Sequence, residues 1–191
     1  MYPYQYPYSY PYYAYPPISN YYMIPNDRSM SNESDYAVNF WPYTNTQSDR
    51  NTVLKDYGKE PFVVNINQAT KHNNTFRTAI WTGNHLQVTL MSINVGDDIG
   101  LEVHPNIDQF LRIEEGQGLV QMGDAKDQLY FQKRVYDDDA IMVPAGKWHN
   151  LINTGNRPLK LYTIYAPPEH PFGTIHKTKA DAIAAEENHH E

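Results

Sequence analysis

The sequence predicts an all-β fold, an antiparallel sandwich or barrel, within a chain of 191 residues. Short runs of β-branched and aromatic residues follow one another from Phe62 onward, and turns rich in Gly, Asn and Asp separate them. The run 85–93, HLQVTLMSI, alternates with a period of two, which is typical of a strand with two different faces. No run with a helical period interrupts the series, so a parallel sheet with crossover helices is not expected.

The expected strands have similar composition and follow each other at short spacing. In chain order they are 62–70, 76–83, 85–93, 108–113, 118–122, 129–135 and 140–146, then a strand that His149 begins, and finally 159–167. One short helix is expected near the C-terminus, in KTKADAIAAEE at 177–187. Thr178 can cap this helix, because Asp181 follows three residues later and an Ala-rich body comes after it.

The beginning of the chain has a different composition from the predicted domain. Ten of the first 22 residues are Tyr and five are Pro, which favours an extended, disordered tail. We therefore divide the chain into a Tyr/Pro-rich tail at 1–26, a polar and partly docked linker at 27–60, a barrel at 61–170, and a C-terminal helix and tail at 171–191.

Removal of the first 50 residues is expected to change the melting temperature by no more than a few degrees. The tail contributes almost no aliphatic surface that could be buried, so folding of the barrel should not depend on it. Thermal unfolding of the full chain and of a chain that starts at Asn51 checks this expectation. A collapse of the melting temperature would show that the tail packs into the fold.

Composition excludes several classes of function. The formal net charge is −7 and no cluster of Lys and Arg occurs, so nucleic acid is not an expected partner. The chain has no Cys, so a metal site would use His, carboxylate and amide oxygen. The chain has no long apolar run, so we do not expect a membrane span. The expected location is the cytoplasm, or a surface layer such as a spore coat that the Tyr-rich tail would join.

Two short stretches hold the residues with chemical potential. In the first, Glu102 and His104 are two residues apart and would share one face of a strand, and Gln109 opens the next strand. Such a pair is more often a solvated face, but two adjacent antiparallel strands can also direct these three side chains to one point. In the second stretch, Pro144 and Gly146 form a tight turn directly before His149.

These stretches resemble the two motifs of the cupin superfamily. The first motif has Gly96 as its opening glycine and Gly116 as its closing one. Glu102 stands where the family usually has its first histidine, His104 matches the second, and Gln109 stands at the usual glutamate. The motif residues therefore keep the family spacing, with two of the ligand types exchanged.

The second motif follows in the correct order. Asp138 replaces its leading glycine, whereas Pro144, Gly146, His149 and Asn153 all match. The resemblance implies an antiparallel jelly-roll barrel that pairs into a homodimer. It also implies one divalent metal ion, Fe, Mn, Zn or Ni, with four ligands: Glu102, His104, Gln109 and His149.

Three functions follow from the resemblance as expectations. The first is an enzyme, similar to isomerases, that acts on a small oxygenated substrate such as a sugar or sugar phosphate. The second is an Fe(II) dioxygenase, because two histidines and one carboxylate form the ligand set of those enzymes. The third is a non-catalytic ligand-binding or coat-assembly protein. No general base is recognisable outside the ligands, and His170 and His176 are expected to be exposed loop residues.

Overall fold

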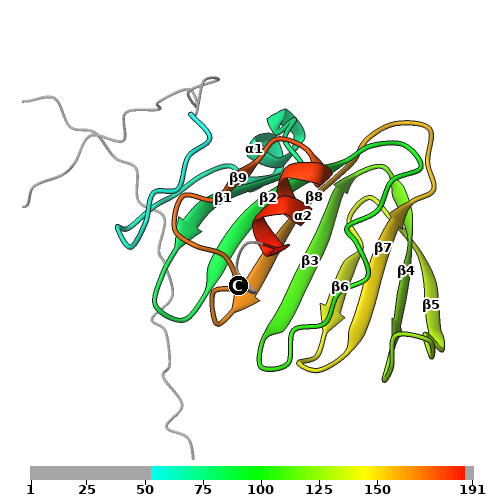
Figure 1. Cartoon of the computed structure of the whole chain (residues 1–191). Helices are drawn as coiled ribbons and strands as arrows, with labels where there is room; N and C mark the ends of the chain where they lie inside the picture. Colours follow the sequence, from blue (N-terminus) through cyan, green and yellow to red (C-terminus); the bar gives the residue numbers. More distant parts are fainter. Residues whose placement is uncertain (1–52, 188–191) are drawn as a thin grey trace, which may run out of the picture. The chain divides into compact units, whose positions relative to one another are not determined.

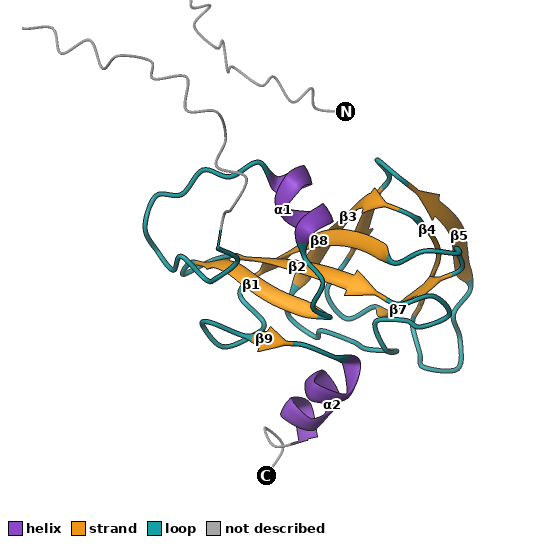
Figure 2. Ribbon diagram, turned by 90° about the horizontal axis from the view of Figure 1, so that it is seen from above, coloured by secondary structure: helices purple, strands orange, loops and turns teal. Residues whose placement is uncertain are grey.

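The computed structural model describes residues 53–187, which form two antiparallel β-sheets (Figure 1). The predicted tail at 1–26, the linker up to residue 52 and the last four residues lie outside the described part. The larger sheet has six strands in the order β6-β3-β8-β2-β1-β9, and the smaller sheet has the order β5-β4-β7. Figure 2 shows the smaller sheet packed at one end of the larger one. The predicted all-β, antiparallel jelly-roll fold is confirmed.

The strand bounds agree with most of the predicted runs. The six-stranded sheet contains β1 (Arg77–Thr82), β2 (Gln87–Ile93), β3 (Asp108–Glu115), β6 (Ala140–Val143), β8 (Leu159–Ala166) and β9 (Ile175–His176). The three-stranded sheet contains β4 (Gln117–Gly123), β5 (Phe131–Tyr136) and β7 (Trp148–Asn153).

The alternation in β2 separates an interior face from an outer face. Gln87, Thr89 and Met91 point into the space between the sheets and are at most 1% exposed. Val88 and Leu90 lie on the opposite face, where they pack against Ala69 and its neighbours. One end of the interior is an aliphatic core, and the other end contains polar side chains. The sequence pattern therefore places a polar glutamine inside the barrel.

The strand predicted at 62–70 is wrong, because its second half forms the helix α1 (Ile66–His72). The side chain of Asn65 accepts a hydrogen bond from the backbone N–H of Gln68 at 3.0 Å, which caps the first turn. Ile66 and Ala69 face the same side at helical spacing and cover the outer face of the large sheet. The cap and this spacing outweigh the β-rich run before Asn65.

The C-terminal helix is confirmed as α2 (Lys179–Glu187). Thr178 and Asp181 form a reciprocal cap. The backbone N–H of Thr178 donates to Asp181 Oδ2 at 2.9 Å, and that of Asp181 donates to Thr178 Oγ1 at 3.2 Å. Ala182 is 2% exposed and belongs to the interior core. Among residues 53–187, no helix is long and apolar enough to cross a membrane.

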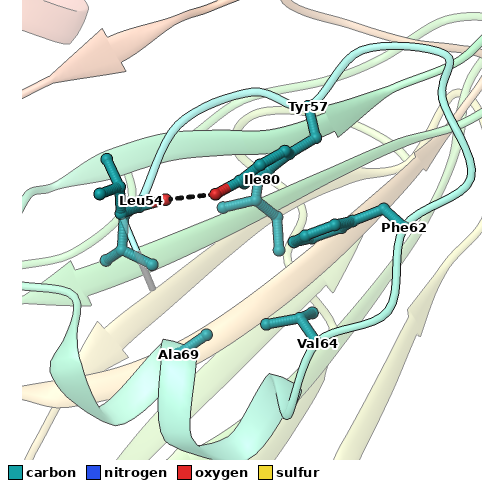
Figure 3. Close-up of a pocket in the computed structure, with 7 residues that line it drawn as sticks. Leu54, Tyr57, Phe62, Val64, Ala69 and Ile80 are labelled. Carbon is teal, nitrogen blue, oxygen red and sulfur yellow. Dashed lines mark hydrogen bonds between the residues drawn. The ribbon is translucent and has the colours of Figure 1, made fainter. Parts of the chain in front are cut away.

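Residues 53–64 cover the outer side of the large sheet next to α1. Figure 3 shows a pocket there, with the ring of Tyr57 stacked on Phe62 at a centroid distance of 4.1 Å. The backbone N–H of Tyr57 donates to the carbonyl of Ile80 in β1, which ties this segment to the sheet. The lining is apolar, consisting of Val53, Leu54, Tyr57, Phe62, Val64, Ala69 and Ile80. The hydroxyl of Tyr57 donates to the carbonyl of Val53 at 3.1 Å, and the other lining side chains are aliphatic or aromatic, so this pocket offers packing surface.

Candidate metal centre

Glu102 and His149 lie directly opposite each other on two paired segments. The backbone N–H of Glu102 donates to the carbonyl of His149 at 3.0 Å, and the N–H of His149 donates to the carbonyl of Glu102 at 2.9 Å. Residues 98–102 thus continue the small sheet beside β7. The prediction that Glu102 and Gln109 lie on adjacent strands is wrong, because β3 pairs with β6 and β8 in the large sheet.

A tight turn brings His104 to the same place. The backbone N–H of Gly146 donates to the carbonyl of His104 at 2.8 Å, so the Pro144–Gly146 turn holds the segment that carries His104. Gly146 has a φ of +79°, a conformation in which residues with a Cβ are strained. Asp138, at the usual position of the motif's leading glycine, also has a positive φ, +71°. It keeps the left-handed conformation, which Asp tolerates better than most residues.

Three potential ligand atoms converge inside the barrel. Oε1 of Glu102 lies 3.4 Å from Nε2 of His104 and 3.3 Å from Nε2 of His149. All three atoms lie within 4.8 Å of one another. His104 is 7% exposed and His149 is 1% exposed, so water does not surround the imidazole rings. The sequence prediction that these three side chains come together agrees with this geometry.

The hydrogen bond of His149 determines which of its nitrogens can bind a metal. Nδ1 of His149 lies 3.0 Å from the carbonyl oxygen of Lys147, which can only accept a hydrogen bond. In a neutral ring the proton is therefore on Nδ1, and Nε2 directs its lone pair toward the carboxylate of Glu102. Two electron pairs that face each other at 3.3 Å repel unless a cation lies between them. A divalent metal ion fits this requirement.

The charges around His104 favour its protonated form when no metal is bound. Burial lowers its pKa, but the carboxylates of Glu102 and Glu169 outweigh burial and raise the pKa to about 9. Burial raises the pKa of Glu102, and the neighbouring His104, His149 and Arg77 outweigh burial and bring it well below the usual range. Proton and metal therefore compete for the same nitrogen of His104.

Glu169 adds a feature that is common around metal-binding histidines. Its Oε1 lies 3.3 Å from Nδ1 of His104, on the opposite side of the ring from Glu102. A carboxylate at this nitrogen fixes the ring orientation and leaves Nε2 free as a ligand. The sequence did not identify Glu169, because it follows β8 in a loop and has no motif spacing to the other residues.

Gln109 points into the interior, as predicted, from the large sheet. Its Nε2 donates to Oγ1 of Thr163 at 3.2 Å, and its buried Oε1 has no hydrogen-bond partner among residues 53–187. Its backbone is paired with that of Tyr165, whose ring stands edge-on to His104 at a centroid distance of 5.6 Å. A free amide oxygen is thus directed into this part of the barrel. Its role as a fourth ligand stays a prediction.

Replacement of Gln109 with Glu is expected to preserve metal binding and to bind the metal at least as tightly. A charged oxygen replaces a neutral one at similar reach, which favours a divalent cation. The metal-free variant should melt a few degrees lower, because a second carboxylate then lies near Glu102. Metal titration and thermal unfolding check both effects, and Gln121→Glu on the outer face of β4 is the matched control. A variant that no longer binds metal would contradict Gln109 as a ligand position.

His170 lies closer to the site than the sequence predicted. The expectation that it is an exposed loop residue is wrong, because its ring packs edge-on against Tyr165 at 5.1 Å and its Nε2 is buried. Gln87 holds the His170 backbone with both ends of its amide. Its Oε1 accepts from the N–H of His170 at 3.0 Å, and its Nε2 donates to the carbonyl at 2.8 Å. In the sequence, the one sign of this contact was the polar Gln87 on one face of the alternating run 85–93.

Asn153, a motif residue, and Arg112 have structural roles. Asn153 donates to the carbonyls of Ile93 and Arg157 and accepts from the N–H of Gly155, so it fixes the turn after β7. Arg112 makes ion pairs with Glu114 and Asp138 on the outer side of β3. Neither residue is part of the metal centre.

The site has several buried polar atoms without a hydrogen-bond partner in the described part of the chain. Three belong to the converging ligands, namely Glu102 Oε1, His104 Nε2 and His149 Nε2. Buried polar atoms are normally paired, and a cation would satisfy all three at once. The donor set of two imidazoles, one carboxylate and one amide oxygen suits Fe, Mn, Zn or Ni.

Comparison with known proteins finds a family match over the region that contains the candidate site. The sequence pattern of the Cupin domain family matches residues 89–165, which include Glu102, His104, Gln109 and His149. The chain is 62% identical over 182 residues to the protein YrkC of Bacillus subtilis, covering 92% of this chain and 94% of that protein. It is also 42% identical over 115 residues to the protein L612 of Acanthamoeba polyphaga mimivirus, covering 60% and 70% of the two chains.

A similar crystal structure is that of BH2720 from Bacillus halodurans. The two chains are 68% identical and superpose with a TM-score of 0.68, which covers 68% of this chain and 98% of that one. None of these three names carries an activity. The comparisons therefore support the fold of the region that contains the candidate site.

Proposed function

This chain belongs to the cupin superfamily, and from that premise we propose that it is a metal-dependent enzyme that acts on a small oxygenated substrate. The observation that carries the proposal is the convergence of Glu102, His104 and His149 within 4.8 Å inside the barrel. Within this proposal, we favour a sugar or sugar phosphate as the substrate and an isomerisation as the reaction. One divalent ion would polarise oxygen atoms of the substrate when it is bound.

The residues around the site have separable roles in this proposal. Glu102, His104 and His149 hold the cation, and Gln109 offers a neutral fourth oxygen. With a divalent cation and one carboxylate, these four side chains have a formal charge of +1, which suits substrates with hydroxyl or anionic oxygens. Burial of the two rings limits access of water to the same space.

An isomerisation needs a group that transfers a proton between neighbouring carbon atoms. The sequence offered no base outside the ligands, whereas the structure places His170 beside Tyr165 at the polar end of the interior. Burial lowers the pKa of His170 to about 3, so its imidazole is neutral, but a base with so low a pKa is too weak to remove a proton from carbon near pH 7. His170 is therefore suited to donate a hydrogen bond to a substrate oxygen, and we place no proton transfer on it.

The alternatives differ in measurable ways. A dioxygenase would use the same two histidines and one carboxylate with Fe(II) and would consume oxygen. A non-catalytic protein would bind a ligand without turnover. To separate the three, protein loaded in turn with Fe, Mn, Zn or Ni is incubated with sugars, sugar phosphates and catechols, while products and oxygen uptake are followed.

The expected result is interconversion of a sugar or sugar phosphate without oxygen uptake, and loss of this activity in His149→Ala. Oxygen consumption that depends on Fe would support the dioxygenase instead. Metal binding without turnover of any compound would support the binding protein. A protein that binds none of the four metals would contradict the metal-dependent enzyme altogether.

A further inference from the structure

Arg77 is a buried arginine on the inner face of β1, 1% exposed. Its Nε and Nη1 atoms have no hydrogen-bond partner among residues 53–187. Glu186 of α2 forms an ion pair with it, but the distance of 3.7 Å is longer than a hydrogen bond, and the Glu186 side chain is 57% exposed. A buried guanidinium is costly unless its N–H groups are paired. Arg77 therefore has donors for which this part of the chain supplies no acceptor.

Three further side chains beside Arg77 also have buried, unpaired polar atoms. These atoms are the hydroxyl of Tyr165, Nε2 of His170 and Nδ1 of His176. His176 is the backbone partner of Arg77 in the pairing of β9 with β1. Its ring lies 6.5 Å from that of His170, which in turn lies 5.1 Å from Tyr165. We call Arg77, Tyr165, His170 and His176 the Arg77 cluster.

The charges of the Arg77 cluster favour an anion. Burial lowers the pKa of His170 and of His176, and the positive charge of Arg77 lowers both further, so both imidazoles are neutral. Tyr165 is fully buried, and its unpaired hydroxyl can donate a hydrogen bond. The cluster thus combines one permanent cation with three neutral groups, each of which can donate a hydrogen bond. Such a set is complementary to the oxygens of an anion.

The Arg77 cluster lies next to the metal centre. Tyr165 belongs to the cluster, and its ring also stands 5.6 Å from that of His104. In the large sheet, the backbone of Tyr165 pairs with Gln87 on one side and with Gln109 on the other. Gln87 holds the His170 backbone by two hydrogen bonds, which fixes the ring that completes the cluster. One small molecule could therefore contact both sites.

We propose that the Arg77 cluster binds an oxyanionic group of the substrate, a carboxylate or a phosphate, while other oxygens of that substrate reach the metal centre. This inference rests on the proposed function and narrows it to anionic substrates. The exposed carboxylate of Glu186 lies 3.7 Å from the guanidinium, so a bound anion would have to compete only with this long contact. Neutral sugars lack the group that this cluster would recognise.

The test uses metal-free protein, so that binding of the anion is separated from binding of the metal. Glycolate supplies a carboxylate, inorganic phosphate supplies a phosphate, and ethylene glycol is the neutral comparison. Calorimetric titration is done on the unsubstituted full-length protein and on three full-length variants, Arg77→Gln, Arg77→Lys and Tyr165→Phe. The control is Arg134→Gln on exposed β5, which removes the same charge far from the cluster.

The expected result is binding of at least one of the two anions and no binding of ethylene glycol. Arg77→Gln should weaken that binding by about tenfold or more, since a charge-assisted hydrogen bond is lost. Arg77→Lys should recover part of the loss, Tyr165→Phe should weaken binding by a smaller factor, and Arg134→Gln should leave it unchanged. Whichever anion binds more tightly identifies the group.

Several results would overturn the proposal. Equal affinity in folded Arg77→Gln and in the full chain is one of them, and absence of binding of both anions is another. If Arg77→Gln does not fold, Tyr165→Phe decides, because it removes only a hydroxyl, and unchanged affinity in this variant counts against the cluster. A protein that binds metal but neither anion would refute this inference and leave the metal-dependent enzyme intact.

Discussion

Replacement of His149 with alanine is expected to abolish stoichiometric metal binding, with an affinity loss greater than 100-fold. His149 supplies one of three converging ligand atoms, and it is 1% exposed, so no solvent-facing side chain can replace it. Removal of a partner outside the ligands already costs about 10- to 100-fold in affinity at typical sites, and removal of a ligand should cost more. Metal content by mass spectrometry and metal titration measure the loss.

The same variant should lose the stabilisation that metal gives to the fold. At a free metal concentration of about 100 times the dissociation constant, linkage stabilises a protein by about 2.7 kcal/mol. For a chain of this size, that corresponds to an increase of about 5–10 °C in melting temperature. The increase should appear in the full chain and disappear in His149→Ala. Glu102 and His149 belong to segments joined by two backbone hydrogen bonds, so the variant itself should still fold.

His85→Ala is the matched control, because His85 is an exposed histidine in the loop between β1 and β2. It should keep both the metal and the increase in melting temperature. Full metal occupancy in His149→Ala would refute the assignment of the site. Equal loss in the two variants would point to nonspecific binding by exposed histidines.

Several features of the fold and the site followed from local sequence patterns. The alternation in 85–93 separates inner from outer residues, and Gln87 lies inside the barrel as the pattern allowed. Glu102 and His104 direct their side chains to the same point, and the Pro144–Gly146 turn delivers His149 to it. These features depend on residues close together in sequence, for which periodicity and turn chemistry are informative.

Features that depend on tertiary pairing were not predictable. Glu102 pairs with His149, 47 positions further along the chain, whereas Gln109 lies in the other sheet. The sequence contains no signal for this division between sheets, because two successive strands of a jelly roll need not be neighbours. His170 similarly reaches the interior through hydrogen bonds with Gln87, which is 83 residues away.

At the helix α1, a local pattern was present but predicted the wrong structure. The β-branched residues before Asn65 predict a strand, and Asn65 nevertheless caps a helix. The helix packs on Leu90 and Ile80 of the large sheet, so tertiary burial decides between two local tendencies. Propensity alone does not include that burial.

Metal affinity is expected to increase about tenfold for each pH unit between about pH 7 and pH 9, and to level off above pH 9. The unperturbed pKa of a histidine would place the end of this increase near 6.5. In the metal-free protein, however, Glu102 and Glu169 outweigh burial and raise the pKa of His104 to about 9. Below that pH a metal must displace one proton from Nε2, and each pH unit changes this competition tenfold.

The stability of the metal-free protein should change in the opposite direction. The pKa of His104 is higher in the folded chain than in the unfolded chain, so its protonation stabilises the fold. This contribution is complete below about pH 6.5 and is lost as the pH rises through about 9. The difference in melting temperature between metal-bound and metal-free protein should therefore be larger at pH 9 than at pH 7.

Glu169→Gln identifies the origin of this pH dependence. The variant removes one of the two carboxylates at His104, so the pKa of His104 should fall and the affinity should level off at a lower pH than in the full chain. Its maximal affinity should also decrease, because the ring loses the carboxylate that orients it. A purely structural effect would lower the metal affinity equally at every pH, and the pH at which the affinity levels off would not change.

Titrations between pH 6 and 10, in which a competing chelator fixes the free metal concentration, distinguish the two effects. If the metal affinity of the unsubstituted protein is constant above pH 6.5, the carboxylates do not hold a proton on His104.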